Sequence, residues 1–349
     1  NVGGFEKDLK NYLNHDVEVA ALSSGTAALH LALIILGIKQ GDEVLCQSLT
    51  FSASANPIVY VGATPVFIDS EPYTWNMCPD SLEMAIKDRL AKGKSPKAII
   101  VVHLYGMPAK MNEILEVAQK YNIPVIEDAA EALGSAYQGR KCGTFGLMSI
   151  LSFNGNKIIT TSGGGALVCN TLEQKNKAVY LSTQARENAP HYQHSQIGYN
   201  YRMSNISAGI GRGQMEVLDK RVEARRNNHF FYVKLFQEIE GVTVFSEPNE
   251  DFYSNHWLSA LTVDERITGW SNHDLMLQFE KEKIESRPLW KPMHLQPVFE
   301  NCIYYGNSVA EDLFNKGLCL PSGSNLTEEQ KNRIKEVVLK MKYTTTEIK

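Results

Sequence analysis

The sequence predicts an α/β protein in which a large, mostly parallel sheet is followed by a smaller α+β domain. Short apolar runs alternate with helix-length segments through the first half of the chain, and shorter mixed elements follow after about residue 240. The chain has 349 residues, 43% of them hydrophobic, which is enough for one sizeable core and a second domain. We therefore expect a large domain over residues 1–240, including long connecting helices, and a small domain over 241–349.

The expected elements of the large domain alternate in order. Apolar runs predict strands at 17–22, 43–46, 65–68, 98–102, 124–127, 143–153 and 165–169. Helices are expected at 27–36, 53–61, 80–92 and 110–122, with one or two long helices within 208–240. Such alternation places helices on both faces of the sheet, and ligands of such sheets bind beyond the carboxyl ends of the strands.

Shorter elements are expected after residue 241. The pattern predicts strands at 242–245, 257–263, 283–286 and 318–320, and helices at 271–281, 307–316 and 327–341. Polar, aromatic-rich loops at 184–188 and 198–202 separate this region from the alternating one.

The turn after the first strand reads Ser23-Ser24-Gly25-Thr26 and leads directly into an apolar helix. Free backbone N–H groups, the positive end of the helix dipole and two hydroxyls make such a turn an anion site. Simple N-capping by Ser23 or Ser24 explains the same residues equally well. Both interpretations stay open at this point.

Polar residues follow three of the predicted strands. Thr50-Phe51, the stretch from His103 to Gly106, and Glu127-Asp128 each come where a strand ends. A carboxylate there often only caps the next helix. Asp128, however, lies between a very apolar strand and a run of small residues, so we expect it to be buried beside a cationic partner.

A single lysine stands out in the stretch from Ser152 to Gly165. Lys157 lies between an Asn-Gly turn and a β-branched run that ends in three glycines. Glycines allow close approach of a backbone or a ligand. The stretch therefore predicts that Lys157 is a reactive lysine in a functional site. The ordinary alternative is a lysine exposed to solvent in a turn.

Composition argues against several other classes of protein. The net charge is -4, and the densest basic cluster (Lys220, Arg221, Arg225, Arg226) lies on a helical pattern typical of a solvated face, so no nucleic-acid partner is expected. The apolar run 27–36 is too short to span a membrane, and we recognise no secretory signal. The six cysteines are scattered without a C-x-x-C pair, and the nine histidines lack metal-ligand spacing. We expect a cytoplasmic protein with reduced thiols and no metal site.

Five motifs occur in a fixed order: S-S-G-T-A-A-L, T-F-S-A-S, E-D-A-A-E-A-L-G-S, S-F-N-G-N-K-I-I-T-T-S-G-G-G and G-Y-N-Y-R-M-S-N. In that order they resemble the pyridoxal phosphate-dependent sugar aminotransferases of the DegT/DnrJ/EryC1/StrS family, over nearly the whole chain. The resemblance implies the aspartate-aminotransferase-type fold, fold type I. S-T-Q-A-R-E-N and E-S-R-P-L-W-K-P-M-H-L-Q look most like the bacillosamine-pathway subgroup, which acts on UDP-4-keto-6-deoxy-N-acetylglucosamine.

The resemblance implies two catalytic residues. Lys157 would form the internal aldimine with pyridoxal 5′-phosphate and then serve as the base that moves a proton between substrate and cofactor. Asp128 would face the pyridine nitrogen and keep it protonated, so that the ring can accept electrons. Glu131 matches a polar position near the phenolic oxygen, where a glutamate is acceptable only if it shares a proton or stays solvated.

The remaining site residues also come from the resemblance. Gly25, Thr26 and Ser152 would hold the cofactor phosphate, and Phe51 would stack on the ring. Asn200 would reach the phosphate from the neighbouring subunit, which implies a homodimer with shared active sites. Possible contacts to the nucleotide sugar are Arg202, His294, Arg287, Arg186 and Trp290; for His294 a packed or capping role is an equal alternative.

The implied reaction transfers the amino group of L-glutamate to C4 of a nucleotide-linked 4-keto-6-deoxy sugar. A GDP-4-keto-6-deoxymannose or dTDP-sugar aminotransferase would share every cofactor residue and stays open. The family's sugar dehydratases carry histidine in place of the lysine, and a silent regulatory protein on this fold would have lost Lys157 or Asp128. Two departures from the family are visible: relatives usually carry further residues before G-G-F-E, and several show N-S-A-T where this chain has S-S-G-T.

Overall fold

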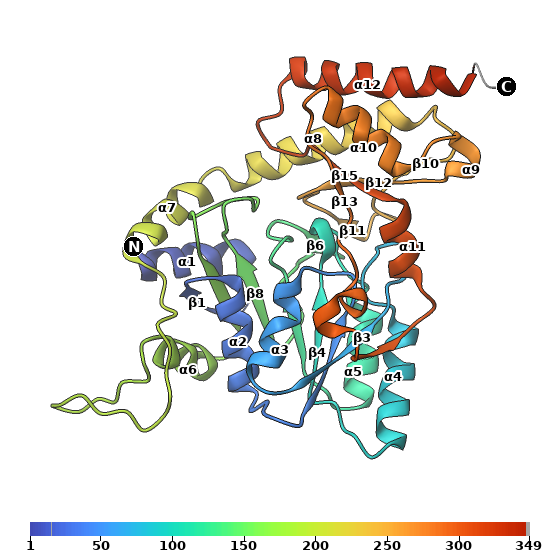
Figure 1. Ribbon diagram of the computed structural model, residues 1–349. Helices are drawn as coiled ribbons and strands as arrows, with labels where there is room; N and C mark the ends of the chain where they lie inside the picture. Colours follow the sequence, from blue (N-terminus) through green and yellow to red (C-terminus); the bar gives the residue numbers. More distant parts are fainter. Residues whose placement is uncertain (15, 347–349) are drawn as a thin grey trace.

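The computed structural model describes residues 1–14 and 16–346 and is built around an eight-stranded sheet (Figure 1). The strand order is β1-β9-β8-β5-β4-β2-β3-β14, and all strands run parallel except β9, which is antiparallel to both of its neighbours. Its strands are β1 (Glu18–Leu22), β2 (Glu43–Gln47), β3 (Thr64–Ile68), β4 (Ala98–Val102), β5 (Val125–Asp128), β8 (Met148–Ser152), β9 (Gly165–Cys169) and β14 (Ile303–Tyr305).

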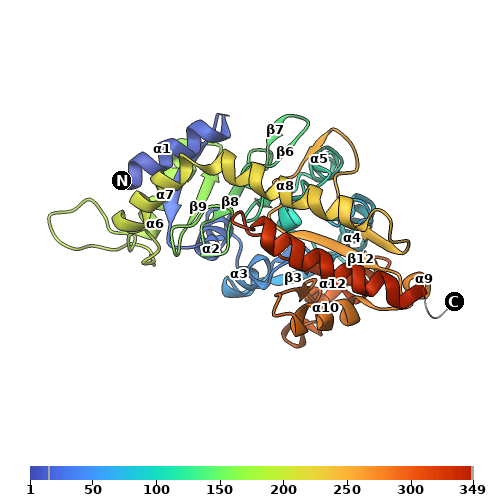
Figure 2. The same cartoon turned by 90° about the horizontal axis from the view of Figure 1, so that it is seen from above.

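Helices cover both faces of this sheet, as Figures 1 and 2 show. The helices of the large sheet are α1 (Val2–Leu13), α2 (Gly25–Ile35), α3 (Asn56–Tyr60), α4 (Pro79–Ala91), α5 (Met111–Lys120), α6 (Leu172–Ser182) and α7 (Asn205–Met215). Side chains alternate between the faces: Val44 and Cys46 of β2 belong to the core under α2 and α6, and Leu45 to the core under α4 and α5. Burial on both faces explains why these strands read as continuous apolar runs.

The second half of the chain builds a smaller antiparallel sheet in the order β10-β12-β15-β13. Its strands are β10 (Val242–Val244), β12 (Ser259–Val263), β13 (Arg287–Pro288) and β15 (Gly317–Leu320). The helices of this half are α8 (Leu218–Phe236), α9 (Glu265–Thr268), α10 (Asn272–Lys281), α11 (Val309–Lys316) and α12 (Glu328–Thr346). A separate core, which includes Tyr232, Phe279 and Val338, lies between this sheet and its helices.

Several elements differ from those the sequence predicted. The expected helix 53–61 is divided into a 3₁₀ turn, η1 (Ser52–Ser54), and α3, because Pro57 lacks an N–H and fits only the first turn of a new helix. The expected strand 283–286 is absent; Lys283 has a left-handed φ of 57°, and pairing begins at Arg287. Strand β14 was missed, and it returns the chain to the edge of the large sheet beside β3.

A short three-stranded sheet, β11-β6-β7, joins the two halves; its strands are β6 (Ala136–Tyr137), β7 (Arg140–Lys141) and β11 (Phe252–Tyr253). The other short turns are η2 (Leu104–Gly106), η3 (Met293–Leu295) and η4 (Pro297–Phe299). No helix in the described part of the chain is both long and apolar enough to cross a membrane.

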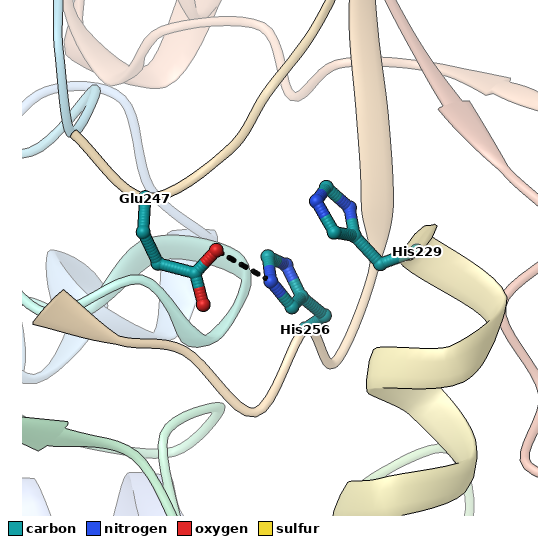
Figure 3. Close-up of side chains that lie close together, drawn as sticks. All are labelled: His229, Glu247 and His256. Carbon is teal, nitrogen blue, oxygen red and sulfur yellow. Dashed lines mark hydrogen bonds and ion pairs between the residues drawn. The ribbon is translucent and has the colours of Figure 1, made fainter. Parts of the chain in front are cut away.

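Among the described residues, three potential metal ligands lie close together: His229 of α8, Glu247 and His256 (Figure 3). The two imidazole rings are stacked, 3.6 Å apart and 6° from parallel. The nitrogen lone pairs lie in the ring planes, so stacked rings do not converge on one ion. Glu247 accepts hydrogen bonds from His256 Nε2 (3.0 Å) and Arg226 Nη1 (2.5 Å). The cluster therefore fastens α8 to the segment that leads into β12.

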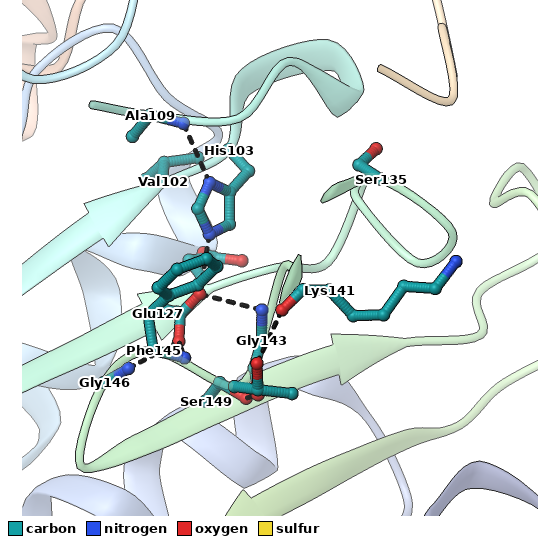
Figure 4. Close-up of polar contacts among 12 residues, drawn as sticks. Val102, His103, Ala109, Glu127, Ser135, Lys141, Gly143, Phe145, Gly146 and Ser149 are labelled. Carbon is teal, nitrogen blue, oxygen red and sulfur yellow. Dashed lines mark hydrogen bonds and ion pairs between the residues drawn. The ribbon is translucent and has the colours of Figure 1, made fainter. Parts of the chain in front are cut away.

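Strand β8 begins later than the predicted strand 143–153, and Glu127 supplies the reason (Figure 4). Its carboxylate accepts hydrogen bonds from the backbone N–H groups of Gly143 (2.7 Å), Phe145 (2.6 Å) and Gly146 (2.6 Å). These amides bind a side chain and hold their segment in a loop. His103 Nε2 donates to the same carboxylate (2.8 Å), while its Nδ1 accepts from the Ala109 N–H (3.0 Å). His103 is thus part of the core and not of an open sheet edge.

Candidate active site

A cavity of about 1190 Å³ lies beyond the carboxyl ends of the parallel strands. The large domain contributes the turn after β1, the turn after β2, the end of β5 and the segment after β8. The small domain contributes the stretch 283–291 and the turn that leads into α12. Nine of the predicted site residues line it: Gly25, Thr26, Phe51, Asp128, Glu131, Ser152, Lys157, Arg287 and Trp290.

Lys157 points into this cavity, and only 11% of its side chain is exposed. Its Nζ lies 3.4 Å from Glu131 Oε1 and 4.2 Å from the centre of the Trp257 ring. The turn is held locally, since the Lys157 N–H donates to the Asn154 carbonyl at 3.0 Å. Lys157 is therefore not the exposed turn lysine that was its ordinary alternative.

Asp128 ends β5, and its buried carboxylate faces the cavity. Ser54 Oγ donates to Oδ2 at 2.6 Å, and the Ala130 N–H donates to Oδ1 at 3.2 Å. Thr50 Oγ1 lies 2.7 Å from Ser54 Oγ and extends this chain of hydroxyls. The contacts of Asp128 in the described part of the chain are thus neutral hydrogen bonds, and the cationic partner that burial led us to expect is not among them. Such a carboxylate suits a ligand that brings its own positive charge.

Glu131 lies on the same wall as Asp128, three residues further along the chain. It is buried, and its Oε2 accepts a hydrogen bond from the Tyr105 N–H at 2.7 Å. Burial raises the pKa of Glu131 to about 7, although Lys157 and the Tyr105 amide act in the opposite direction. We expected a glutamate to be acceptable here only if it stays solvated or shares a proton. Glu131 is buried and therefore not solvated, whereas its position beside Lys157 fits the sharing of a proton.

The first turn of α2 lies against the ends of β8 and β9. A Cβ atom at Gly25 would lie 3.2 Å from Ser152 Cβ, and one at Gly165 would lie 2.3 Å from the Gly25 nitrogen. Glycine at both positions lets the helix start come this close to the strands. Ser24 caps α2 by accepting from the Ala27 N–H at 3.0 Å, so the capping interpretation holds for that residue. The cavity-lining Gly25, Thr26 and Ser152 form a cradle that fits a phosphate group.

Comparisons with known proteins agree with this arrangement. The model of the DegT/DnrJ/EryC1/StrS aminotransferase family matches residues 1–339. The chain belongs to this family. It is therefore a pyridoxal phosphate-dependent sugar aminotransferase, and the α/β fold expected from the resemblance is confirmed.

Individual relatives cover the chain almost completely. EpsN of Bacillus subtilis (strain 168), whose name describes a pyridoxal phosphate-dependent aminotransferase, is 52% identical over 100% of this chain and 89% of its own length. GDP-perosamine synthase of Escherichia coli O157:H7 is 39% identical over 91% of this chain and 84% of its own. The crystal structure of a DegT DnrJ EryC1 StrS aminotransferase from Brucella abortus superposes with a TM-score of 0.90, at 31% identity, over 97% of this chain and 89% of that one.

Four predicted site residues of this aminotransferase lie away from the cavity of the single chain. Arg202 Nη1 pairs with Glu6 at 2.6 Å. His294 lies 2.6 Å from Ser48 Oγ and stacks on Tyr304, as its packed alternative requires. Arg186 and Asn200 belong to the loop between α6 and α7, which projects from the body in Figure 1. There Arg186 covers Tyr192, and Asn200 is exposed.

Two aromatic residues complete the wall around Phe51, which is 55% exposed and faces the cavity. Its ring lies 5.5 Å from Trp290, whose ring in turn lies 6.2 Å from Trp257. Trp290 was an expected substrate contact, but Trp257 and Ser54 were not expected in the site. The sequence predicted Trp257 only as the first residue of a strand. Its contact with Lys157, 100 positions earlier in the chain, leaves no signal in the periodicity or in the order of the motifs.

Proposed function

We propose that this aminotransferase moves the amino group of L-glutamate to C4 of UDP-4-keto-6-deoxy-N-acetylglucosamine. The observation that carries the proposal is the meeting of Lys157, Asp128 and the Gly25 turn on one cavity wall, which fits an aldehyde, a pyridine nitrogen and a phosphate of one cofactor. The choice of sugar is supported by the subgroup motifs at 182–188 and 285–296, both of which lie outside the cofactor cradle.

Bound pyridoxal phosphate supplies an electron-accepting ring and an aldehyde that carries the amino group between the two substrates. The residues of the chain direct the protons. Asp128 holds a proton on the pyridine nitrogen, a charge-assisted hydrogen bond worth roughly 1.5–3 kcal/mol. Lys157, as the free amine, would move a proton between the substrate carbon and the cofactor carbon that carried the aldehyde. Glu131, beside Lys157 Nζ, takes up or releases a proton when the charge on the lysine changes.

A GDP-linked sugar is the second candidate. It is supported by the 39% identity to a GDP-perosamine synthase across most of both chains. The cofactor residues would be the same for either sugar, so only the groups around the outer cavity distinguish the two. These include Arg287, which is exposed at the rim and pairs with Glu285.

The test supplies each keto-sugar together with L-glutamate to the full chain loaded with pyridoxal phosphate, and separates products by mass. We expect two results. The loaded protein should show an absorbance band that depends on Lys157, and UDP-4-keto-6-deoxy-N-acetylglucosamine should be converted to an amino sugar. Lys157→Ala is the matched control and should lose both while remaining folded. An amino product from the GDP sugar alone would select the second candidate. A Lys157→Ala protein that keeps substantial transamination would refute the role of the lysine.

A further inference from the structure

Trp257 touches Lys157 from two directions. Its ring face lies 4.2 Å from Lys157 Nζ, and its indole N–H donates to the carbonyl of Asn156, the preceding residue, at 2.8 Å. The side chain is 3% exposed and forms part of the cavity wall. Trp257 thus holds the backbone next to Lys157 through Asn156 and also contacts the lysine nitrogen with its ring.

Two carboxylates at the end of β5, Asp128 and Glu131, line the cavity together with Lys157, and in the described structure it is Glu131 that pairs with the lysine. Glu131 is 3.4 Å away, longer than a strong ion pair, and burial raises its pKa to about 7, so near neutral pH it carries only part of a charge. The ring quadrupole of tryptophan does not titrate, and it attracts a cation more strongly than that of tyrosine or phenylalanine. Burial strengthens this attraction, since few water molecules compete for the ammonium group.

The segment that carries Trp257 is held rigidly to the large domain. Asn255 Nδ2 donates to the carbonyls of Glu131 (2.8 Å) and Leu133 (2.9 Å), while its Oδ1 accepts from the Trp257 N–H (2.8 Å). Gly106 makes this contact possible: its φ is +94°, and a Cβ there would lie 1.9 Å from Asn255 Oδ1. Arg225 Nη1 donates to the Trp257 carbonyl from α8. These hydrogen bonds fix the position of Trp257 relative to Glu131.

We propose that Trp257 is a positioning residue that aims the nitrogen of Lys157 into the cavity and favours a proton on that nitrogen while the lysine carries the cofactor. This inference rests on the proposed role of Lys157 as the cofactor lysine. It deepens that role by naming the group that favours the proton on the lysine nitrogen while the cofactor is bound to it; the free amine then acts as the base. The hydrogen bond from the Trp257 indole to the Asn156 carbonyl links the second half of the chain to the turn that carries Lys157.

The test is an absorbance titration of the pyridoxal phosphate-loaded full chain against pH, for wild type, Trp257→Phe and Trp257→Leu. The midpoint reports the proton on the lysine nitrogen and does not depend on substrate. Without the ring, we expect the midpoint of Trp257→Leu to fall by about one pH unit. Trp257→Phe keeps a weaker ring and should show a smaller fall. Trp270→Leu removes a buried indole from the separate core of the small sheet, outside the cavity, and should leave the midpoint in place.

Two results would overturn the inference. One is a Trp257→Leu protein, or a Trp257→Phe protein where the leucine variant does not fold, that binds cofactor with the wild-type midpoint. The other is an equal shift in Trp270→Leu, which would reduce the effect to general packing. Failure of the proposed sugar would leave the titration readable, because no sugar is present. Loss of the Lys157-dependent band in the wild type would instead refute the proposed function.

Discussion

Asp128 and Glu131 lie three residues apart and differ in how their charge is balanced. Asp128 accepts a hydroxyl and an amide hydrogen bond, and it faces the cavity without a charged protein partner. Glu131 accepts one amide hydrogen bond and lies beside Lys157. We therefore propose that Asp128 pairs with a positive charge on the ligand and that Glu131 exchanges a proton with Lys157. Each assignment leads to a separate prediction.

Asp128→Asn should lower kcat more than it weakens cofactor binding. The amide keeps an oxygen for the Ala130 N–H but cannot hold a proton on the pyridine nitrogen, and charge develops on the ring only during the reaction. One charge-assisted hydrogen bond corresponds to a fall in kcat of about tenfold to a hundredfold, and we expect a loss of this size. Steady-state kinetics and cofactor titration measure the two effects. Asp312→Asn, at an exposed position of α11, is the control. Equal losses in kcat and cofactor affinity for Asp128→Asn would contradict the assignment.

Glu131→Gln should stabilise the cofactor-free protein at pH 8 but not at pH 5. Burial raises the folded pKa of Glu131 to about 7, so the folded state binds more protons than the unfolded state between about pH 4.5 and 7. Stability is therefore lost as pH rises through this window, and glutamine removes that loss. We expect a gain of about 1–3 kcal/mol in the free energy of unfolding at pH 8.

Urea unfolding at several pH values checks this prediction. The exposed carboxylate Glu300, changed to glutamine, should give no such pH-dependent difference. An offset between Glu131→Gln and wild type that stays constant from pH 5 to 8 would show that Glu131 does not titrate in this range.

At the scale of elements, a buried ion pair joins α4 to the sheet. Arg89 of α4 and Glu43 of β2 are both buried, with Nε–Oε2 and Nη2–Oε1 distances of 2.9 and 2.7 Å. Around them α4 packs through apolar side chains such as Leu82 and Ile86. The pair fixes where α4 lies along β2, because a bidentate contact has only one good geometry.

Arg89→Met should destabilise the fold by about 3–5 kcal/mol, because it leaves the Glu43 charge buried and unpaired. Chemical denaturation measures the loss. The double variant Glu43→Gln with Arg89→Met should be clearly more stable than Arg89→Met alone, since the uncompensated charge is gone. If both variants lost the same amount, packing around Arg89 and not charge would account for the effect.

At the scale of the whole molecule, the site of one chain lacks the predicted contacts from Asn200 and the projecting loop. That loop and the adjoining α7 expose apolar side chains, among them Tyr192, Ile197 and Ile206. We propose that a second copy of the chain covers this surface and brings Asn200 to the cofactor phosphate. Light scattering should then give twice the 39.0 kDa mass of one chain.

Mixing two inactive variants tests the shared site directly. Lys157→Ala and Asn200→Ala should each lose most activity as pure dimers. After subunit exchange at equal amounts, half the dimers contain one of each, and each of these has one intact site, so activity should return to about a quarter of wild type. Light scattering of each variant provides the control for assembly. A cofactor-binding monomer, or a mixture without recovery, would refute the contact across subunits.

Much of the fold followed from local sequence. Apolar runs predicted the parallel strands, because a strand buried on both faces is mostly apolar along its length. Motif order pointed to Lys157, Asp128 and the Gly25 turn, and the structure brings these residues to one cavity. Their positions at strand ends follow from topology that the alternation of elements already implied.

What only the tertiary structure decided are contacts between residues far apart in the chain. Trp257 reaches Lys157, and β14 returns to β3, across separations that leave no periodic signal in the sequence. The late start of β8 depends on Glu127 binding backbone amides that a propensity argument assigns to a strand. Local pattern thus determined most of the elements, and packing between distant segments determined the others and how charge is arranged around the lysine.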